Sequence, residues 1–355
     1  EIEAINLLVL SCLILILFIG IVVIIISIFH YHIAHLFQAP NLANYLGYLS
    51  ISLLGLGFFE IFLFWSLRKE KYTRISRGKV QMNLFHAGGQ LSLGFISGSP
   101  TSLIIGEVIG RNAGGIGLGV LSWKEMKNNF HLISWNMMKQ MAIRYRRFPL
   151  ITTWSSLLGA LTNHLPTFFI VGTLGVKAAG WYLIANRVLA LPNALLGYSV
   201  EQVYLAKSAK LLHRSYSTFV QLFWETVKKL TVISFILFTL AAILAPKTFS
   251  LIFGELWYEA GVFVQCMSIL FFVQLIAGPI SINFDLLELQ HLDIFCGLIR
   301  FLLLIGSMLY SNLFLVEDWQ VVLCLSIAGA IGFMIVGIFS WYALQIYREK
   351  GDIHG

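Results

Sequence analysis

Apolar stretches of about 20 residues recur from one end of the chain to the other, and no other feature restricts the fold as strongly. Each stretch is long enough to cross a bilayer as an α-helix, whose backbone polar groups find their partners within the segment. With 58% of its residues hydrophobic and 12% charged, the chain cannot stay dissolved in water. We therefore expect an all-α polytopic membrane protein with about ten transmembrane helices. The predicted spans are residues 7–29, 45–66, 80–98, 102–121, 149–172, 178–199, 228–246, 260–280, 292–312 and 320–342.

The longest polar connection separates four predicted spans from six and marks an expected boundary between two lobes. Its apolar residues Trp135, Met138, Met141 and Ile143 are interspersed with the basic residues Lys139, Arg144, Arg146 and Arg147. This pattern favours a basic amphipathic helix on the anionic cytoplasmic leaflet, and a solvated linker is the alternative. We expect an N-terminal lobe at 1–121, which the family resemblance described below implies is incomplete, a cytoplasmic linker at 122–148, a C-terminal lobe at 149–347 and a cytoplasmic tail at 348–355.

The basic loop residues fall almost entirely on one side of the membrane when successive loops alternate. Nineteen lie in one set of loops and the tail, whereas the opposite set holds only Lys177 and Lys247. The positive-inside rule places the richer set, and both ends of this chain, in the cytoplasm. The loop at 281–291 departs from the pattern, since it carries Asp285 and Glu288 but no Lys or Arg. The richer set is Arg68, Lys69, Lys71, Arg74, Arg77, Lys79, Lys124, Lys127, Lys139, Arg144, Arg146, Arg147, Lys207, Lys210, Arg214, Lys228, Lys229, Arg348 and Lys350.

Three arginines, Arg111, Arg187 and Arg300, fall within predicted spans, where an uncompensated charge costs at least about 2.5 kcal/mol. Arg187 stands midway along its span beside Asn186 and shortly before Pro192, with no acidic residue within one turn. Its planar guanidinium suits two-point binding of a phosphate group. The alternative is a structural arginine bonded to backbone carbonyls that a kinked neighbour leaves free.

The other two arginines have simpler explanations. Arg111 follows Glu107 by four residues, so the two side chains share a helical face and a structural ion pair is favoured. Arg300 lies roughly two turns inside the cytoplasmic edge of its span, from which it can snorkel to the interface, with substrate binding as the alternative. Glu60 and Glu107 are the acidic residues within predicted spans and are the candidates for coupling transport to an ion.

Two predicted spans carry further polar residues that lipid would not accommodate. The span at 80–98 is the least hydrophobic and includes His86 and Gln90, so we expect it to face a protein interior or a wet cavity. In the fifth span, Asn163 and His164 precede Pro166, where a kink would open the wall of a cavity. Gln90, Asn163 and His164 are therefore candidate substrate contacts, although helix packing explains such residues equally well.

Several kinds of chemistry are not expected. Cys12, Cys266, Cys296 and Cys324 lie in apolar stretches without a CxxC spacing, which is typical of inert thiols. His30, His32 and His35 have the spacing of a loose metal site but no nearby acid or cysteine, so we predict no metal and no cofactor. No phosphate-binding glycine loop or GxSxG elbow occurs, so we expect no enzyme. The net charge of +7 reports orientation in the membrane, not nucleic-acid binding.

A segment at 147–209 carries a recognisable set of short motifs. It contains Arg147-x-Pro149, Leu165-Pro166, Gly-Trp-Tyr at 180–182, and Arg-Val followed by Leu-Pro from Arg187 to Pro192. With EAINLLVLSC near the start and SLRKEKYTRISR after the second span, it resembles the O-antigen and related polysaccharide flippases. These proteins form part of the multidrug/oligosaccharidyl-lipid/polysaccharide exporter superfamily.

The resemblance implies a MATE-like architecture of two six-helix lobes that rock about a central cavity. Ten predicted spans then leave the first two family helices unaccounted for, and the opening EIEAIN reads like an internal loop. We expect an N-terminally truncated sequence, with a processed or mis-started chain as the alternative. The implied substrate is a polyprenyl-diphosphate-linked oligosaccharide, flipped outward across the bacterial inner membrane. The implied partners are membrane lipids, polysaccharide-assembly proteins and H⁺ or Na⁺ as coupling ion. Arg187, Arg111 and Arg300 would hold the diphosphate.

Two other functions stay open at this point. A multidrug exporter of the same superfamily would favour buried carboxylates for cationic drugs, and the predicted spans hold only Glu60 and Glu107. A membrane polysaccharide polymerase would carry a large external loop, whereas the predicted external loops are short.

Overall fold

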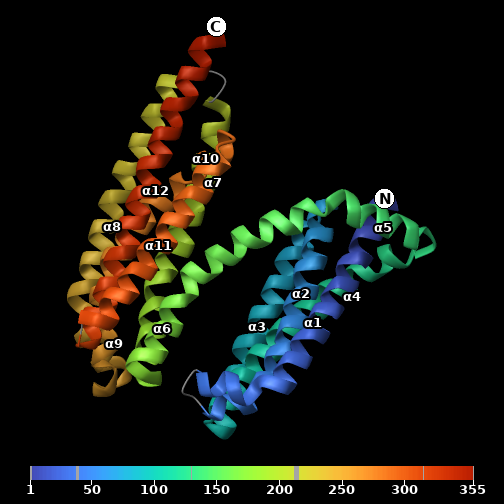
Figure 1. The fold of residues 1–355 in the computed structure, drawn as a ribbon, viewed down its shortest axis with the longest axis horizontal. Helices are drawn as coiled ribbons and strands as arrows, with labels where there is room; N and C mark the ends of the chain where they lie inside the picture. Colours follow the sequence, from blue (N-terminus) through green and yellow to red (C-terminus); the bar gives the residue numbers. More distant parts are fainter. Residues whose placement is uncertain (1, 37–39, 129, 212–215, 315, 355) are drawn as a thin grey trace. The chain divides into compact units, whose positions relative to one another are not determined.

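The computed structural model describes residues 2–36, 40–128, 130–211, 216–314 and 316–354 (Figure 1). Arg214, one of the basic loop residues, and Gly355 at the end of the predicted tail lie outside the described residues. The described residues form helices and contain no β-strand, as expected for a chain of repeated apolar segments. The chain divides into two compact units, unit 1 at Glu1–Ile151 and unit 2 at Thr152–Gly355.

Unit 1 is built on four long helices joined by short turns. The helix α4 packs along both α2 and α3, while α1 packs against α2 (Figure 1). Gly98 ends α3 in the left-handed conformation, at φ 55°, and allows the sharp return into α4. The elements are α1 (Ile2–Leu36), η1 (Pro40–Asn44), α2 (Leu46–Arg68), α3 (Tyr72–Ser97), α4 (Pro100–Asn128), η2 (Phe130–Leu132) and α5 (Trp135–Tyr145).

Glycines let α3 and α4 approach each other closely. Gly106, Gly110 and Gly114 recur every four residues along α4 and form one ridge. A Cβ atom at Gly110 would lie 2.7 Å from Cα of His86 in α3, and one at Gly106 would lie 2.6 Å from the backbone nitrogen of Gln90. Real Cβ atoms essentially never come so near, so only glycine permits this contact. The polar residues of α3 are thereby held against α4.

A second glycine contact joins α4 to α2. A Cβ atom at Gly115 would lie 2.5 Å from the carbonyl oxygen of Gly55 in α2. Beside it, Asn112 donates through Nδ2 to the carbonyl of Ile51 at 3.1 Å and to that of Val108 at 2.9 Å. The helix α4 therefore has close-packed faces toward two neighbours at once.

Large apolar side chains of the helix α1 are exposed along most of its length. Its side chains Ile14, Leu17 and Ile28 are 57%, 68% and 62% exposed. In water such a surface would drive aggregation, whereas lipid chains solvate it without penalty. The pattern fits a helix that faces the bilayer along most of its length.

The connection at 122–148 contains the helix α5, which packs against α1. Met138 and Met141 are buried, 7% and 4% exposed, while Trp135 and Ile143 are 70% and 56% exposed. The methionines predicted to face the leaflet are thus covered by protein, and the exposed apolar residues of α5 are Trp135 and Ile143. An ion pair of 3.1 Å between Arg144 and Glu3 also ties this connection to α1.

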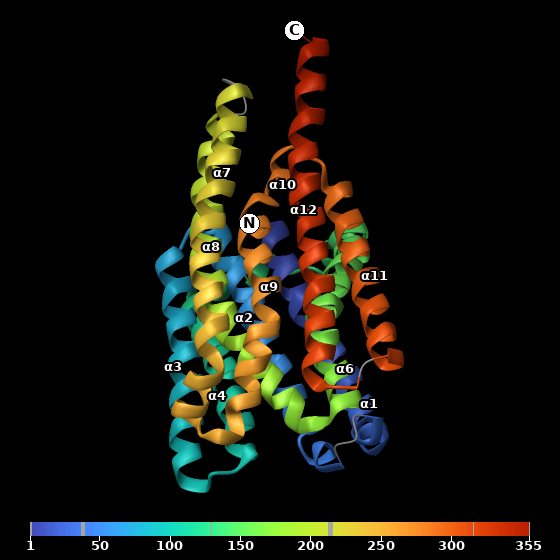
Figure 2. The same ribbon diagram turned by 90° about the vertical axis from the view of Figure 1, so that its left-hand side faces the viewer.

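Unit 2 contains the remaining helices, among which α9 packs between α8 and α12, and α11 packs on α12 (Figure 2). Phe263, Met267, Phe271 and Leu275 form a buried row along α9 at four-residue spacing. They make α9 the centre of the unit 2 core. The elements are α6 (Arg147–Pro192), which begins just before the unit, η3 (Asn193–Gly197), α7 (Tyr198–Leu211), α8 (Tyr216–Phe253), η4 (Glu255–Trp257), α9 (Tyr258–Ile280), α10 (Asn283–Leu286), α11 (Gln290–Phe314) and α12 (Asp318–His354).

Two irregularities interrupt the long helical stretch from α6 to α7. Gly175 breaks α6 with φ 88° and ψ 174°, a conformation that favours glycine. It lies between the predicted spans 149–172 and 178–199, whereas Pro166 remains inside regular helix. After Pro192, the residues Asn193–Gly197 form a π-helix before α7 begins. In such π segments the backbone N–H and C=O groups depart from the α-helical hydrogen-bonding pattern, and they often occur at functional sites.

Eight helices in the described chain are long and apolar enough to cross a membrane. The span predicted at 80–98 is not among them because α3 is too polar by this measure, and the fifth and sixth predicted spans form one continuous stretch, Leu157–Leu211. If α3 is counted as a span and that stretch is divided at Gly175, the described chain has ten candidate spans. The protein is an all-α, multi-pass membrane protein.

Candidate functional site

A cavity of about 370 Å³ lies inside unit 2, between the two parts of α6 and the helices α9, α11 and α12. Its volume falls within the range of about 300–1,000 Å³ that small-molecule sites usually have. Four residues singled out from the sequence lie together on its wall, namely Asn163, His164, Asn186 and Arg300. The other lining residues are Thr162, Pro166, Thr167, Tyr182, Leu183, Ala190, Leu270, Phe271, Gln274, Leu304, Leu325, Ser326, Gly329 and Phe333.

Arg300 supplies the positive charge of this cavity. Its guanidinium carbon lies 3.9 Å from the ring centroid of Phe333 in α12, which is a cation–π contact. Its stem crosses α12 at Gly332, where a Cβ atom would lie 2.6 Å from Cγ of Arg300. No carboxylate in the described part of the chain forms an ion pair with it. Asp293, seven residues earlier in α11, interacts with Arg300 electrostatically at longer range. The structure therefore holds the guanidinium against the cavity by packing, without a carboxylate in contact with it.

The rest of the wall is neutral and rich in hydrogen-bonding groups. Asn163, Asn186 and Gln274 contribute amides, while Thr162, Thr167 and Ser326 contribute hydroxyl groups. Amides and hydroxyls both donate and accept, which suits ligands that carry many hydroxyl groups. No Asp or Glu is among the described residues that line the cavity. Its chemistry thus favours an anionic or hydroxylated ligand over a cation.

Arg187, the leading phosphate candidate from the sequence, does not line this cavity. Its neighbour Asn186 does, and the next residue of a helix points about 100° further around the axis. The Arg187 side chain is exposed on unit 2, and no described residue pairs with it. Sequence reasoning also did not select Gln274 as a site residue. A lone glutamine inside the apolar run FFVQLIAGP was the available signal.

A second group of charged residues lies within unit 1, between α3 and α4. Glu107 pairs with Arg111, as their spacing predicted. The other oxygen of the same carboxylate, Oε2, lies 2.7 Å from Nε2 of His86. The sequence had marked His86 only as a polar residue in the weakest span. These charges neutralise one another within the helix pair. They differ in this from Arg300, which faces the cavity of unit 2.

The two remaining candidates also lie in unit 1. Gln90 donates through Nε2 to the carbonyl oxygen of Leu103 at 3.2 Å, so its amide is used in joining α3 to α4. Glu60 in α2 is exposed, and no ion pair reaches it from the described residues. Neither side chain belongs to the cavity in unit 2.

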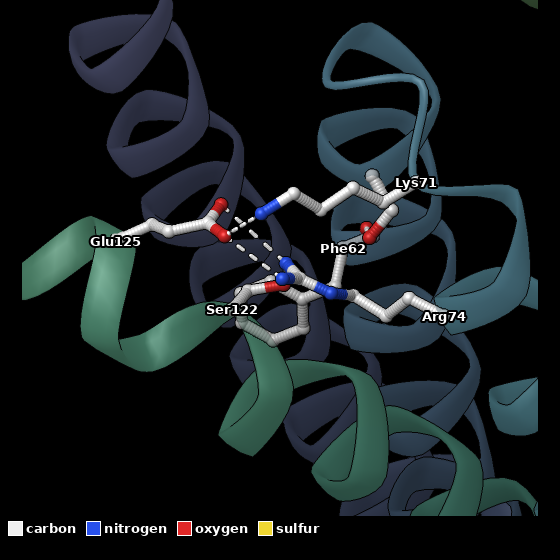
Figure 3. Close-up of polar contacts among 6 residues, drawn as sticks. Phe62, Lys71, Arg74, Ser122 and Glu125 are labelled. Atoms are coloured by element: carbon white, nitrogen blue, oxygen red, sulfur yellow. Dashed lines mark hydrogen bonds and ion pairs between the residues drawn. The ribbon is translucent and has the colours of Figure 1, made fainter.

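A cluster of ion pairs at the other end of α3 and α4 holds the turn between α2 and α3 (Figure 3). Arg74 donates from Nη2 to Glu125 at 2.8 Å and from Nη1 to Oγ of Ser122 at 3.2 Å, and Lys71 pairs with the same carboxylate. Hydrogen bonding from Arg74, followed by that from Lys71, lowers the pKa of Glu125 to about 2. Glu125 therefore stays ionised at neutral pH and anchors two of the basic residues counted in the loops.

The described residues hold no group of three or more His, Cys, Asp or Glu side chains that is placed to bind a metal ion. His30, His32 and His35 lie along α1, where Phe29 and Tyr31 contact two of the rings.

Residues 8–262 match the sequence model of a family described as "Polysaccharide biosynthesis protein". The match covers more than half of the chain. The chain belongs to this family. The matched region includes all of the predicted motifs from 147 to 209 and the α6 wall of the cavity, whereas the lining residues of α9, α11 and α12, Arg300 among them, lie beyond it. No curated protein matches this family member significantly in sequence.

Solved structures of MATE proteins share the fold of this family member. A crystal structure of a MATE point mutant has 12% sequence identity and a TM-score of 0.64, covering 98% of this chain and 79% of the other. A MATE in complex with MaL6 has 13% identity and a TM-score of 0.61, covering 96% and 80%. A MATE in the straight conformation has 12% identity and a TM-score of 0.58, covering 98% and 79%. At such identities the likeness concerns the fold.

Proposed function

We propose that this protein is a transporter that flips a lipid-linked oligosaccharide across the bacterial inner membrane, with its basic loops and both ends of this chain in the cytoplasm. The observation that carries the proposal is the cavity in unit 2, where Arg300 lies among amides and hydroxyls and no carboxylate lines the described wall. Membership of a polysaccharide biosynthesis family and the MATE fold both support it.

Arg300 is the group that we assign to the diphosphate of a polyprenyl carrier. A guanidinium presents a planar fork of donors that matches phosphate oxygens, and a partly desolvated site strengthens the attraction. Packing against Phe333 and Gly332 limits the rotamers of Arg300, so less entropy is lost on binding.

The neutral part of the wall is assigned to the sugar. Asn163, Asn186 and Gln274 present amides that exchange hydrogen bonds with hydroxyl groups, and Phe271 offers an apolar surface for a sugar face. The polyprenyl tail stays in the bilayer, because burying it inside protein would gain little over lipid. Alternating access would then carry the polar part across while the tail remains in lipid.

The first test is complementation of a bacterial strain that lacks its own polysaccharide flippase. Arg300→Ala is expected to lower surface polysaccharide about 10- to 100-fold, the loss typical of a charged hydrogen bond, and Arg300→Lys to restore part of it. Arg187→Ala at matched membrane levels is the control, because Arg187 lies outside the cavity. Failure of the wild type to complement would contradict flipping of that substrate. Full activity of Arg300→Ala would contradict the assignment of the phosphate site to this cavity.

A drug-efflux measurement separates the proposal from a multidrug exporter. A negative site favours cationic drugs, whereas the described lining of the cavity contains an arginine and no carboxylate. We therefore expect no increase in resistance to cationic dyes when the protein is expressed in a pump-deficient strain.

A further inference from the structure

In unit 2, α7 packs against α8 (Figure 2), and a cavity of about 350 Å³ lies between the two helices. Apolar side chains form much of its wall, namely Val200 and Val203 of α7 and Leu222, Leu230 and Ile233 of α8. Val203 and Ile233 are 55% and 43% exposed, so the cavity opens on the surface of the unit. We call it the α7–α8 groove. The proposed function does not use it.

Lysine side chains make the groove basic. Lys207 lies on its α7 wall and Lys229 on its α8 wall. No carboxylate among the described residues forms an ion pair with either lysine. Glu225 also lines the groove, where its Oε1 accepts a hydrogen bond from Nε2 of Gln221 at 3.0 Å. Two lysines and one glutamate leave the described lining with a net charge of +1.

A buried chain of hydrogen bonds holds the back of the groove in place. Tyr204 lines the groove and is only 2% exposed, and its hydroxyl donates to Oδ1 of Asn283 at 3.0 Å. Nδ2 of Asn283 donates to Oγ of Ser340 at 3.0 Å, and that hydroxyl donates to the carbonyl of Ile280 at 2.7 Å. These bonds tie α7 to α9, α10 and α12, so its wall of the groove is formed before a ligand arrives. A preformed site loses less entropy on binding.

The predicted spans put the groove at the edge of the membrane, on the side that the basic loops assign to the cytoplasm. The span 178–199 ends as α7 begins, and the span 228–246 begins next to Lys229. Val200 therefore lies toward the bilayer, and Lys207, seven residues later in α7, lies about 10 Å further out. Apolar side chains toward the bilayer with lysines beyond them match the profile of a phospholipid, whose acyl chains lie below its phosphate.

We propose that the α7–α8 groove binds an anionic phospholipid of the cytoplasmic leaflet, with its phosphate at Lys207 and Lys229. One acyl chain then lies along Val200, Leu230 and Ile233. Basic pockets between helices on the cytoplasmic side bind anionic headgroups, because that leaflet carries the anionic lipids. The net positive charge of the lining selects such a lipid over one whose headgroup is neutral overall.

This lipid site goes beyond the proposed function. It uses the same orientation of the loops, but it requires neither the large cavity nor flipping. A lipid seated between α7 and α8 bridges the two helices and binds only the folded protein, so it also stabilises unit 2.

The test is native mass spectrometry of the purified full chain in detergent, titrated with phosphatidylglycerol or with phosphatidylcholine. The wild type is expected to bind phosphatidylglycerol at least fivefold more tightly. The double variant Lys207→Ala/Lys229→Ala weakens that binding about 25-fold, at about fivefold for each lysine near a membrane surface. Lys210→Ala/Lys228→Ala is the matched control, because it removes the same charge from the same two helices outside the groove. All four lysines are exposed, so neither variant removes a buried contact.

A second measurement locates the acyl chain. Phosphatidylglycerol with a photoactivatable diazirine on one chain is expected to label 200–203 and 230–233 more strongly than the corresponding phosphatidylcholine does, in vesicles that contain either as a minor component.

Three results would overturn the proposal. The first is equal binding of the two lipids by the wild type, and the second is equal weakening by the two double variants. The third is complete displacement of phosphatidylglycerol by an equimolar amount of polyprenyl diphosphate, which would assign the groove to the carrier lipid. These readouts involve no flipping, so a failure of the proposed function would be seen separately, in complementation.

Discussion

Unit 1 and unit 2 differ in how they compensate charged side chains within predicted spans. In unit 1, Glu107 is neutralised by Arg111 and approached by His86, and glycines draw the two helices together around these side chains. In unit 2, Arg300 is fixed by an aromatic ring and a glycine and faces a cavity whose described lining has no carboxylate, while Asp293 acts on it only at longer range. A charge within a span therefore indicates a ligand site only where the structure leaves it uncompensated beside open space.

The largest effect expected from this comparison concerns the glycine ridge. Gly110→Ala places a methyl group against His86, so α3 and α4 must separate, at a cost of about 1–3 kcal/mol in the free energy of unfolding. Gly88→Ala in α3, where nothing lies within 4 Å of the added atom, is the control. Thermal unfolding of the purified variants in detergent measures the difference. Equal melting temperatures would mean that the ridge does not hold unit 1 together.

The next effect distinguishes the neutralised charge from the free one. Glu107→Gln leaves Arg111 without its partner and is expected to cost about 1–2 kcal/mol, less than a fully buried pair because both side chains are about one-third exposed. Arg300→Gln removes the cation–π contact with Phe333 but leaves no contacting carboxylate unpaired, so a smaller loss of stability is expected. Chemical unfolding of the two variants side by side checks this. Equal losses of stability would erase the distinction between the units.

A smaller effect is expected where α12 supports Arg300. Gly332→Ala pushes against Cγ of Arg300 and shifts the guanidinium, and we expect transport to fall about three- to tenfold with little change in stability. Gly337→Ala lies in the same helix but meets only an ordinary contact at 3.8 Å, so it should transport normally. Surface polysaccharide at matched membrane levels is the readout. Normal transport by Gly332→Ala would show that the position of Arg300 is not critical.

The smallest effect concerns the ion pairs around Glu125, because these groups are partly exposed to solvent. The pKa of Glu125 is lowered from 4.5 to about 2, so the carboxylate contributes its full stabilisation above pH 4.5. That contribution is lost progressively as the pH falls from 4.5 toward 2. Urea unfolding of the wild type at pH 5 and pH 3 should therefore show a difference that Glu125→Gln reduces. Identical pH dependence in the two proteins would contradict the assigned role.

The sequence predicted the membrane class and most spans because apolar length and loop charge depend on local residues. It also predicted the Glu107–Arg111 pair, whose members share a helical face at a spacing of four. It could not rank Arg300 above Arg187, because the direction of each side chain depends on which helices pack around it. The predicted spans 149–172 and 178–199 located the break at Gly175, whereas the kink expected at Pro166 is absent, since a proline within a helix is tolerated where neighbours compensate.

The polarity of α3 also has a consequence for how the chain enters the membrane during synthesis. This helix is too polar to be a candidate span by itself, yet it is long enough to cross and packs along α4. The partners of His86 and Gln90, Glu107 and the carbonyl of Leu103, both belong to α4, which is made later. Insertion of α3 is therefore expected to wait for α4, so that the two enter as a hairpin. α3 has no cysteine of its own, so the test introduces one by Leu91→Cys. A nascent chain of this variant that stops after Ser97 should leave the new cysteine accessible to water-soluble thiol reagents.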